Sequence, residues 1–205
     1  MIHYLYASDL DLRPDLAAGM FRDRTAQFRD RMGWDVTVDP MGWETDAYDA
    51  LDPLYVIADD GNGGHAGSMR FLPTTGPTML VDVFPHLIAR RMIRNPMTWE
   101  CTRFCLSPDA GADVARRLLL AASELGLGFG LTHSVGVFDR PMLRVYRRLG
   151  WEPEVLGADD TISAGLWTFS HATHDRLCDA SGLHARTARG WFETAFGDLS
   201  VSMRA

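Results

Sequence analysis

The sequence contains no lysine, and all 20 of its basic residues are arginine. This absence excludes enzymes that form a Schiff base or use a lysine nucleophile, because both mechanisms need a lysine amine. Cysteine is also scarce: Cys101, Cys105 and Cys178 show neither CxxC spacing nor an even count. The pattern predicts reduced, mostly buried thiols, without a structural disulfide or a metal site.

No apolar run reaches the length of about 18 residues that a membrane span needs, and the first residues lack the basic and apolar regions of a signal peptide. We therefore expect a cytoplasmic protein with no membrane partner. Basic stretches are missing too, and a net charge of −7 with a pI near 5.4 argues against nucleic-acid binding. Repeats, linkers and low-complexity segments are also missing, so the 205 residues predict one domain, 1–205.

Short apolar runs alternate with segments of helical periodicity. The runs predict strands at 1–7, 54–59, 66–72, 99–106, 130–138 and 163–169. The periodic segments predict helices at 15–32, 79–94, 113–127, 140–149 and 174–196. Residues 35–53, rich in acidic and aromatic residues, predict a long loop that acts as a lid or substrate wall. The alternation predicts an α/β protein, a single three-layer αβα sandwich with a mixed central sheet.

Three charged residues stand inside predicted strands: Arg70 in GSMRFLP, and Glu100 and Arg103 in WECTRFCL. A charge at a half-buried strand position is costly unless it is paired and hydrogen-bonded. Two interpretations stay open, an internal Arg/Glu ion pair and a pocket for a small substrate that carries a carboxylate. Glu100 and Arg103 point to opposite faces of a regular strand, so one shared pocket requires a β-bulge near Cys101 or Thr102.

A set of residues, in order and with its spacing, resembles the acyl-homoserine-lactone (autoinducer) synthases of quorum-sensing bacteria. Its members are Arg24, Phe28, Trp34, Asp46, Asp49, Arg70, Phe84, Glu100 and Arg103. The resemblance covers roughly residues 20–150. It implies a GNAT-like acyltransferase fold with a V-split sheet. It also implies an enzyme that joins an acyl group from acyl-carrier protein to the amine of S-adenosylmethionine, closes the lactone and releases methylthioadenosine. S-adenosylmethionine is then a substrate, and no cofactor or metal is expected.

The chemistry of S-adenosylmethionine agrees with these residue types, because this substrate has a carboxylate, an ammonium, a sulfonium and an adenine. Guanidinium groups bind carboxylates or hold acidic side chains in place, and aromatic faces attract a sulfonium or adenine. The residues expected to bind S-adenosylmethionine are Arg24, Phe28, Trp34, Asp46 and Arg103. The residues expected to act in catalysis are Glu100, as the base that deprotonates the amine, with Arg103, Asp46, Asp49 and Arg70.

Two further sites follow from the resemblance. The acyl or pantetheine cleft is expected at Phe84, Thr102, Phe104, Ala122, Gly136, Phe138 and Met142. Gly136 stands where many 3-oxo-specific relatives have threonine, which favours a long, unsubstituted or 3-hydroxy acyl chain. Carrier-protein docking is expected at Arg144, Arg147 and Arg148, which share one helix face, with Arg90, Arg91 and Arg94 as a rival patch.

Residues 106–118 lack the glycine-rich loop that ordinary GNAT enzymes use for the pyrophosphate of coenzyme A. This favours a carrier-protein donor, with acyl-CoA as the alternative. Two other function classes stay open: a GNAT-type N-acyltransferase that acts on another amine, and a non-catalytic sensor that binds S-adenosylmethionine or a lactone.

Overall fold

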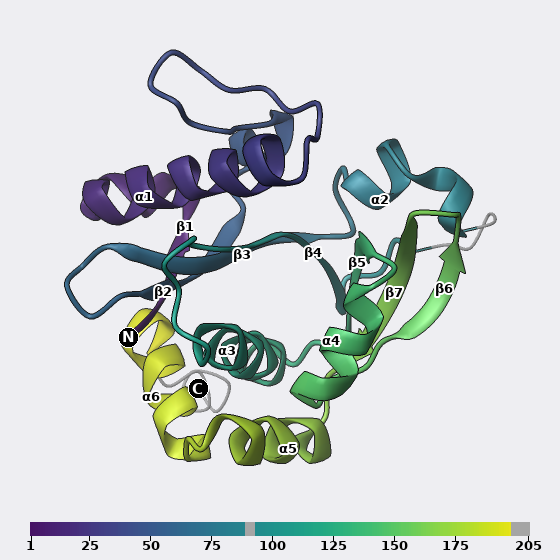
Figure 1. Cartoon of the computed structure of the whole chain (residues 1–205). Helices are drawn as coiled ribbons and strands as arrows, with labels where there is room; N and C mark the ends of the chain where they lie inside the picture. The colour runs from purple at the N-terminus through teal and green to yellow at the C-terminus, as the bar shows by residue number, and fades with distance from the viewer. Residues whose placement is uncertain (89–92, 198–205) are drawn as a thin grey trace. The chain divides into compact units, whose positions relative to one another are not determined.

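The structure is a computed structural model that describes residues 1–88 and 93–197. The chain forms two compact units, which we call unit 1 (Met1–Arg70 and Arg103–Leu118) and unit 2 (Phe71–Thr102 and Leu119–Ala205). Strands β3 (His65–Pro73) and β4 (Thr98–Leu106) each begin in one unit and end in the other (Figure 1). Hydrogen-bonded neighbours follow the order β1-β2-β3-β4-β5-β7-β6.

In unit 1, β1 (Ile2–Tyr6) pairs antiparallel with β2 (Leu54–Asp59). A short 3-10 helix, η1 (Ala7–Leu12), follows β1, and α1 (Pro14–Arg24) starts at a proline, whose fixed φ suits the first helical position. The apolar side of α1 packs on β2 through Met20 and Phe21, which contact Tyr55 and Ile57. Burial of this stripe explains why the helical periodicity was visible in the sequence.

The helix predicted at 15–32 is confirmed, but only its first part is α-helical. At Thr25 the backbone changes to a π-helix, η2 (Thr25–Arg31). A π-helix places more residues in each turn, and such segments occur often at functional sites. After η2 the chain contains no strand until β2. The loop predicted at 35–53 is confirmed, with one 3-10 turn, η3 (Ala47–Leu51), at its end.

The sheet of unit 1 is covered on both faces. A side chain at Gly67 would meet Leu106, Val114 and Leu118, with atoms 2.9–3.0 Å from its Cβ. The start of α3 (Val114–Gly128) therefore packs against one face of β3. Arg70, three residues further along β3, points to the other face. Glycine at 67 allows this close approach of helix and strand.

In unit 2, β5 (His133–Asp139) pairs parallel with β4 and antiparallel with β7 (Ile162–Thr168), which pairs with the edge strand β6 (Glu154–Ala158). The predicted α/β class with a mixed sheet is confirmed. The ladder between β4 and β5 covers only Thr98–Glu100, although both strands continue. The predicted split of the sheet therefore corresponds, in unit 2, to the end of the pairing between β4 and β5 after Glu100.

Two predictions for unit 2 were wrong in detail, and one strand was missed. The helix predicted at 79–94 is not continuous: its described part contains α2 (Met79–Asp82) and the 3-10 helix η4 (Pro85–Ile88), and its residues 89–92 lie outside the described residues. Pro85 explains why α2 does not continue, because proline has no N–H to donate and disfavours helical backbone in the preceding residue. Strand β6 was not predicted. The C-terminal helical segment is divided at Gly182, which has φ +70°, into α5 (His171–Ser181) and α6 (Ala185–Phe196).

The remaining helix of unit 2, α4 (Met142–Leu149), ends at Gly150. None of the helices in residues 1–88 and 93–197 is long and apolar enough to cross a membrane.

Strand β4 contains an extra residue. In unit 1 the Ser107 N–H donates to the carbonyl of Ala66, and in unit 2 the Thr74 N–H donates to the carbonyl of Thr98. Between these two bonds β3 advances from 66 to 74, eight residues, while β4 advances from 98 to 107, nine residues. Arg103, within this stretch, has φ +54°, which is unusual for a non-glycine residue. The predicted β-bulge in β4 is therefore confirmed.

Candidate active site

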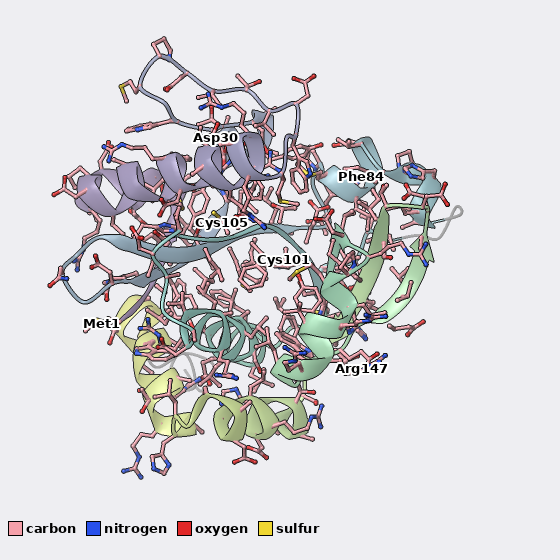
Figure 2. All side chains as sticks on the ribbon, in the orientation of Figure 1. Met1, Asp30, Phe84, Cys101, Cys105 and Arg147 are labelled. Atoms are coloured by element: carbon pink, nitrogen blue, oxygen red, sulfur yellow. The ribbon has the colours of Figure 1, made fainter. Side chains whose placement is uncertain are left out.

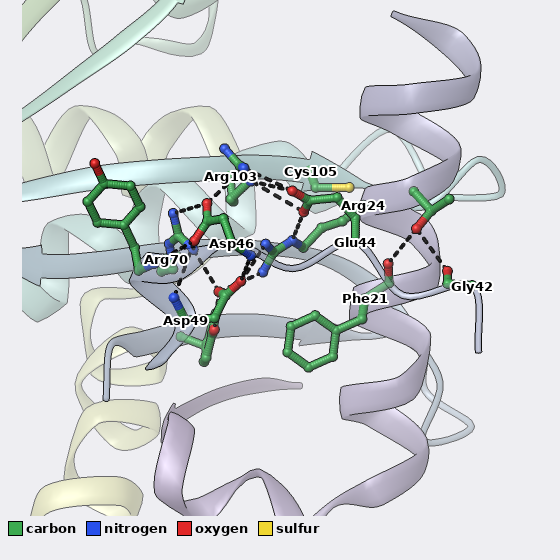
Figure 3. A network of polar contacts seen from close by, with 12 residues as sticks. Phe21, Arg24, Gly42, Glu44, Asp46, Asp49, Arg70, Arg103 and Cys105 are labelled. Carbon is green, nitrogen blue, oxygen red and sulfur yellow. Dashed lines mark hydrogen bonds and ion pairs between the residues drawn. The ribbon is translucent and has the colours of Figure 1, made fainter. Parts of the chain in front are cut away.

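Charged side chains from distant parts of unit 1 meet in one network, drawn in Figure 3. Three are arginines, at the end of α1, in β3 and in β4, and three are acids from the loop before β2, so their formal charges cancel. The members are Arg24, Arg70, Arg103, Glu44, Asp46 and Asp49. The sequence predicted five of them to act together.

Asp49 lies at the centre of the network. It accepts hydrogen bonds from both Nη atoms of Arg24 at 3.0 and 2.9 Å, from Arg70 Nη1 at 2.7 Å and from the Tyr55 hydroxyl at 2.6 Å. Burial alone would raise the pKa of Asp49, but the hydrogen bonds and positive charge of Arg24, with the charge of Arg70, outweigh it and lower the pKa well below its usual range. Asp49 is therefore ionised in the folded protein.

Asp46 begins the η3 turn and joins it to two strands. Its side chain accepts from the backbone N–H groups of Tyr48 and Asp49, while the Asp49 side chain accepts from the Asp46 N–H at 2.8 Å, a reciprocal capping box. The same carboxylate accepts from both Nη atoms of Arg70, and its Oδ2 lies 2.8 Å from Arg103 Nη2. The turn and the ion network thus stabilise each other.

Glu44 is the member that the sequence analysis missed. It is fully buried, accepts from Arg24 Nε at 2.5 Å and from Arg103 Nη2 at 2.8 Å, and so joins α1 to β4. It lies in the acidic loop predicted at 35–53 as a lid or substrate wall, and no role of its own was predicted for it. One signal was available: Arg103 in an apolar strand needs a buried acid, and Glu44 belongs to the same acidic loop as Asp46 and Asp49.

The network has a buried side and a more open side. The side chains of Arg24, Arg70 and Glu44 are at most 1 % exposed, whereas those of Arg103, Asp49 and Asp46 are 8 %, 11 % and 17 % exposed. Arg70 and Arg103 are both paired with acids of the loop before β2, Arg70 with Asp46 and Arg103 with Glu44. A ligand that reaches the network from its open side therefore meets Asp46, Asp49 and Arg103.

The two predicted aromatic residues differ in access. Phe28 is 3 % exposed, lies parallel to Trp34 with ring centroids 5.1 Å apart, and has the Arg103 guanidinium 5.3 Å from its centroid. Trp34 is 40 % exposed. Trp34 is thus the ring with an accessible face, while Phe28 packs between other groups.

Glu100 lies in unit 2 and is 1 % exposed. Its carboxylate accepts hydrogen bonds from the backbone N–H groups of Met79, at 2.9 Å, and Leu80, at 2.6 Å, which are the first residues of α2. Free N–H groups at a helix start need such an acceptor. Glu100 therefore holds the start of α2, a role that the sequence did not predict, and its role as a base stays a prediction.

The residues predicted for the acyl cleft are partly or wholly buried: Phe84, Thr102, Phe104, Ala122, Gly136, Phe138 and Met142. A Cβ at Gly136 would lie 2.6 Å from the carbonyl oxygen of Cys101, so its lack of a side chain is explained by the close approach of β4. Phe138 packs edge-to-face on Tyr146 and Trp167. These contacts do not test the acyl-cleft assignment, which stays a prediction.

The predicted docking residues lie on α4 and are exposed. Arg147, labelled in Figure 2, donates through Nη2 to Glu152 at 2.6 Å and through Nε at 3.0 Å, so its charge is partly offset. Arg144 and Arg148 are exposed on the same helix. Of the rival patch, Arg94 is exposed, while Arg90 and Arg91 lie outside the described residues. Across the described residues, no group of three histidine, cysteine or acidic side chains is arranged to hold a metal ion.

The sequence matches the model of a protein family described as autoinducer synthase over residues 9–171. An acyl-homoserine-lactone synthase of Rhizobium etli is 45% identical over 159 residues, which cover 72% of this chain and 74% of the relative. An isovaleryl-homoserine lactone synthase of Bradyrhizobium diazoefficiens is 30% identical over 191 residues, covering 91% of this chain and 85% of the relative.

Solved structures give the same result. A CoA-dependent acyl-homoserine lactone synthase, BjaI, with SAM and isopentyl-CoA, superposes with a TM-score of 0.80 at 29% sequence identity, covering 89% of this chain and 90% of that one. The similarity therefore extends over both the fold and most of the sequence.

Proposed function

Since this chain belongs to the autoinducer synthase family and is an acyl-homoserine-lactone synthase, an acyltransferase, we propose that it acylates the amine of S-adenosylmethionine and then closes the lactone. The amine attacks the carbonyl carbon of an acyl thioester, an amide bond forms, and the thiol leaves. The carboxylate then attacks the γ-carbon, its carbon–sulfur bond breaks, and methylthioadenosine leaves. The products are an N-acyl-homoserine lactone, a thiol and methylthioadenosine, and no cofactor is needed.

The observation that carries this proposal is the Asp46–Arg103 pair at the open side of the network, where opposite charges lie 2.8 Å apart. The α-ammonium and α-carboxylate of an amino acid form a second pair of opposite charges, which is complementary to Asp46 and Arg103. A zwitterionic group can therefore place its ammonium on Asp46 and its carboxylate on Arg103. The network is already neutral, so the zwitterionic amino-acid group adds no net charge to a largely buried site, and the positive charge of the sulfonium requires a separate contact.

Trp34 supplies the second element of the proposed site. Its ring is 40 % exposed and stacks through its inner face on Phe28. A sulfonium over the outer face would gain about 0.5–2 kcal/mol from the cation–π interaction, whereas an adenine there would stack on the ring. Phe28, at 3 % exposed, is better suited to hold Trp34 and Arg103 in place.

Glu100 is the proposed base, acting directly or through water. An α-ammonium must lose a proton before it can attack, and a carboxylate held in a defined orientation can accept that proton. The two N–H groups of α2 provide such an orientation. The variant that tests this role is Glu100→Gln, which keeps the size of the side chain and an oxygen acceptor but removes the base.

Acyl-carrier protein is the donor that we propose. The exposed cations of α4 suit an acidic partner, and the chain lacks the usual pyrophosphate loop. Acyl-CoA is the second candidate, because the similar synthase BjaI is described as CoA-dependent.

The test is a reconstitution with S-adenosylmethionine and matched acyl thioesters of carrier protein and of coenzyme A, read by mass spectrometry. We expect lactone and methylthioadenosine in equal amounts, with the carrier thioester as the better donor. Arg103→Lys, which keeps the charge but loses the forked geometry, should reduce kcat/KM about 100-fold. Thioester consumption that depends on an added amine other than S-adenosylmethionine, without methylthioadenosine, would instead indicate an N-acyltransferase for that amine, and binding without turnover would indicate a sensor.

A further inference from the structure

Tyr55 supplies a neutral donor to the charged network of unit 1. Its hydroxyl donates to Asp49 Oδ1 at 2.6 Å, and the residue is 1 % exposed. Burial, followed by the negative charge of Asp49, raises the pKa of Tyr55 above its usual range, so the hydroxyl keeps its proton and remains a donor.

The hydroxyl is held from a rigid part of the fold. Tyr55 lies in β2 opposite Leu5 of β1, and its ring packs edge-to-face on Phe21 of α1, with centroids 6.4 Å apart. Met20 and Ile57 belong to the same buried cluster. The loop that carries Asp49, in contrast, has no strand of its own between η2 and β2. Tyr55 therefore ties a loop residue to the core.

Asp49 connects Tyr55 to the open side of the network. Its Oδ2 accepts from the Asp46 N–H at 2.8 Å, which fixes the start of η3. Asp46 in turn lies 2.8 Å from Arg103. A chain of short contacts thus leads from the Tyr55 hydroxyl to the pair that faces a ligand.

We propose that Tyr55 is a positioning residue for S-adenosylmethionine, because its hydroxyl fixes Asp49 and thereby sets the orientation of the Asp46–Arg103 pair. This inference rests on the proposed function. Tyr55 touches neither substrate nor reacting atoms, and it acts through Asp49 alone.

The test is Tyr55→Phe, which removes one oxygen and keeps the ring. We expect the KM and Kd for S-adenosylmethionine to rise about tenfold, as for loss of a hydrogen bond to a charged group, with the KM for the acyl thioester unchanged. Tyr4→Phe is the matched control. It removes a hydroxyl from a buried tyrosine of β1 in the same unit and should leave both KM values unchanged.

A double-variant experiment separates positioning from simple stabilisation. If Tyr55 acts through Asp49, Tyr55→Phe should have no further effect on the Kd for S-adenosylmethionine in an Asp49→Ala background, which removes the acceptor of the Tyr55 hydroxyl. An equal loss of affinity in both backgrounds, or a lower melting temperature with an unchanged Kd, would overturn the inference. Wild-type protein that does not bind S-adenosylmethionine would overturn the proposed function as well, so the two failures are distinguishable.

Discussion

At the residue scale, Asp49 contributes to folding only while it is ionised. Its pKa in the folded protein is lowered, chiefly because the hydrogen bonds and charge of Arg24 overcome the effect of burial. A lowered pKa means that the stabilisation is complete above the unfolded value of about 3.9 and is lost as the pH falls toward the folded value.

We expect Asp49→Asn to lower the free energy of unfolding by about 3 kcal/mol at pH 7, because it leaves the buried Arg24 without one of its partners. The difference from wild type should shrink at pH 3, as measured by urea unfolding at both pH values. Asp30→Asn, the same change at an exposed acid that pairs with the exposed Arg29, should have no measurable effect. A difference that is equal at pH 7 and pH 3 would contradict this explanation.

The residues that the sequence could and could not predict differ in one physical respect. Arg70 and Arg103 stand in apolar strands, where a charge is conspicuous because its burial must be compensated. Glu44 and Tyr55 are equally buried, but their sequence surroundings do not reveal it. An acid in a polar loop resembles a solvated residue, and a tyrosine in a strand resembles core packing. Their roles depend on contacts with distant segments, which a local pattern cannot specify.

At the scale of elements, the predicted bounds were best where an element is largely buried. Strand β2 was predicted residue for residue because it is almost wholly apolar and buried. Strand β6 was missed, since it is a short edge strand with a shift of register between Val155 and Gly157 and little burial. The π-helix η2 was also missed, because an apolar side does not distinguish a π-turn from an α-turn.

The bulge in β4 was predictable for a different reason. It followed from a requirement of function, that Glu100 and Arg103 serve one pocket, and not from the local propensities of CTRF. The structure confirms the bulge, with Arg103 at φ +54°. Whether both side chains serve one pocket stays a prediction.

The basic face of α4 gives a prediction at the same scale. Arg147 is already paired with Glu152, so Arg144 and Arg148 should contribute most to the attraction of an acidic carrier protein. We expect Arg144→Glu with Arg148→Glu to raise the KM for the acyl-carrier thioester about tenfold at low salt, and less at high salt because the charges are screened. The KM for S-adenosylmethionine should not change.

Arg147→Glu is the matched control, with the same charge reversal on the same helix, and it should have a smaller effect. An unchanged KM in the double variant would reject docking at α4. An unchanged KM together with efficient use of acyl-CoA would favour the alternative donor.

At the scale of the whole molecule, the prediction of a single domain becomes a question of cooperativity. Unit 1 and unit 2 each have a buried apolar cluster. Strands β3 and β4, however, supply residues to both units. Unfolding of one unit would therefore break hydrogen bonds at one end of β3 and β4. The other unit contains the remaining residues of the same two strands.

We expect calorimetry to show one unfolding transition for this chain, as for a single cooperative domain. Met20→Ala removes a fully buried side chain from unit 1, and Phe192→Ala does so in unit 2. Substitutions of this kind cost about 2–5 kcal/mol, so each variant should lower the temperature of the same transition. Two transitions, each moved by only one of the variants, would show that the units fold independently. That result would refute the one-domain prediction, because continuous strands would then not be sufficient to couple the two clusters.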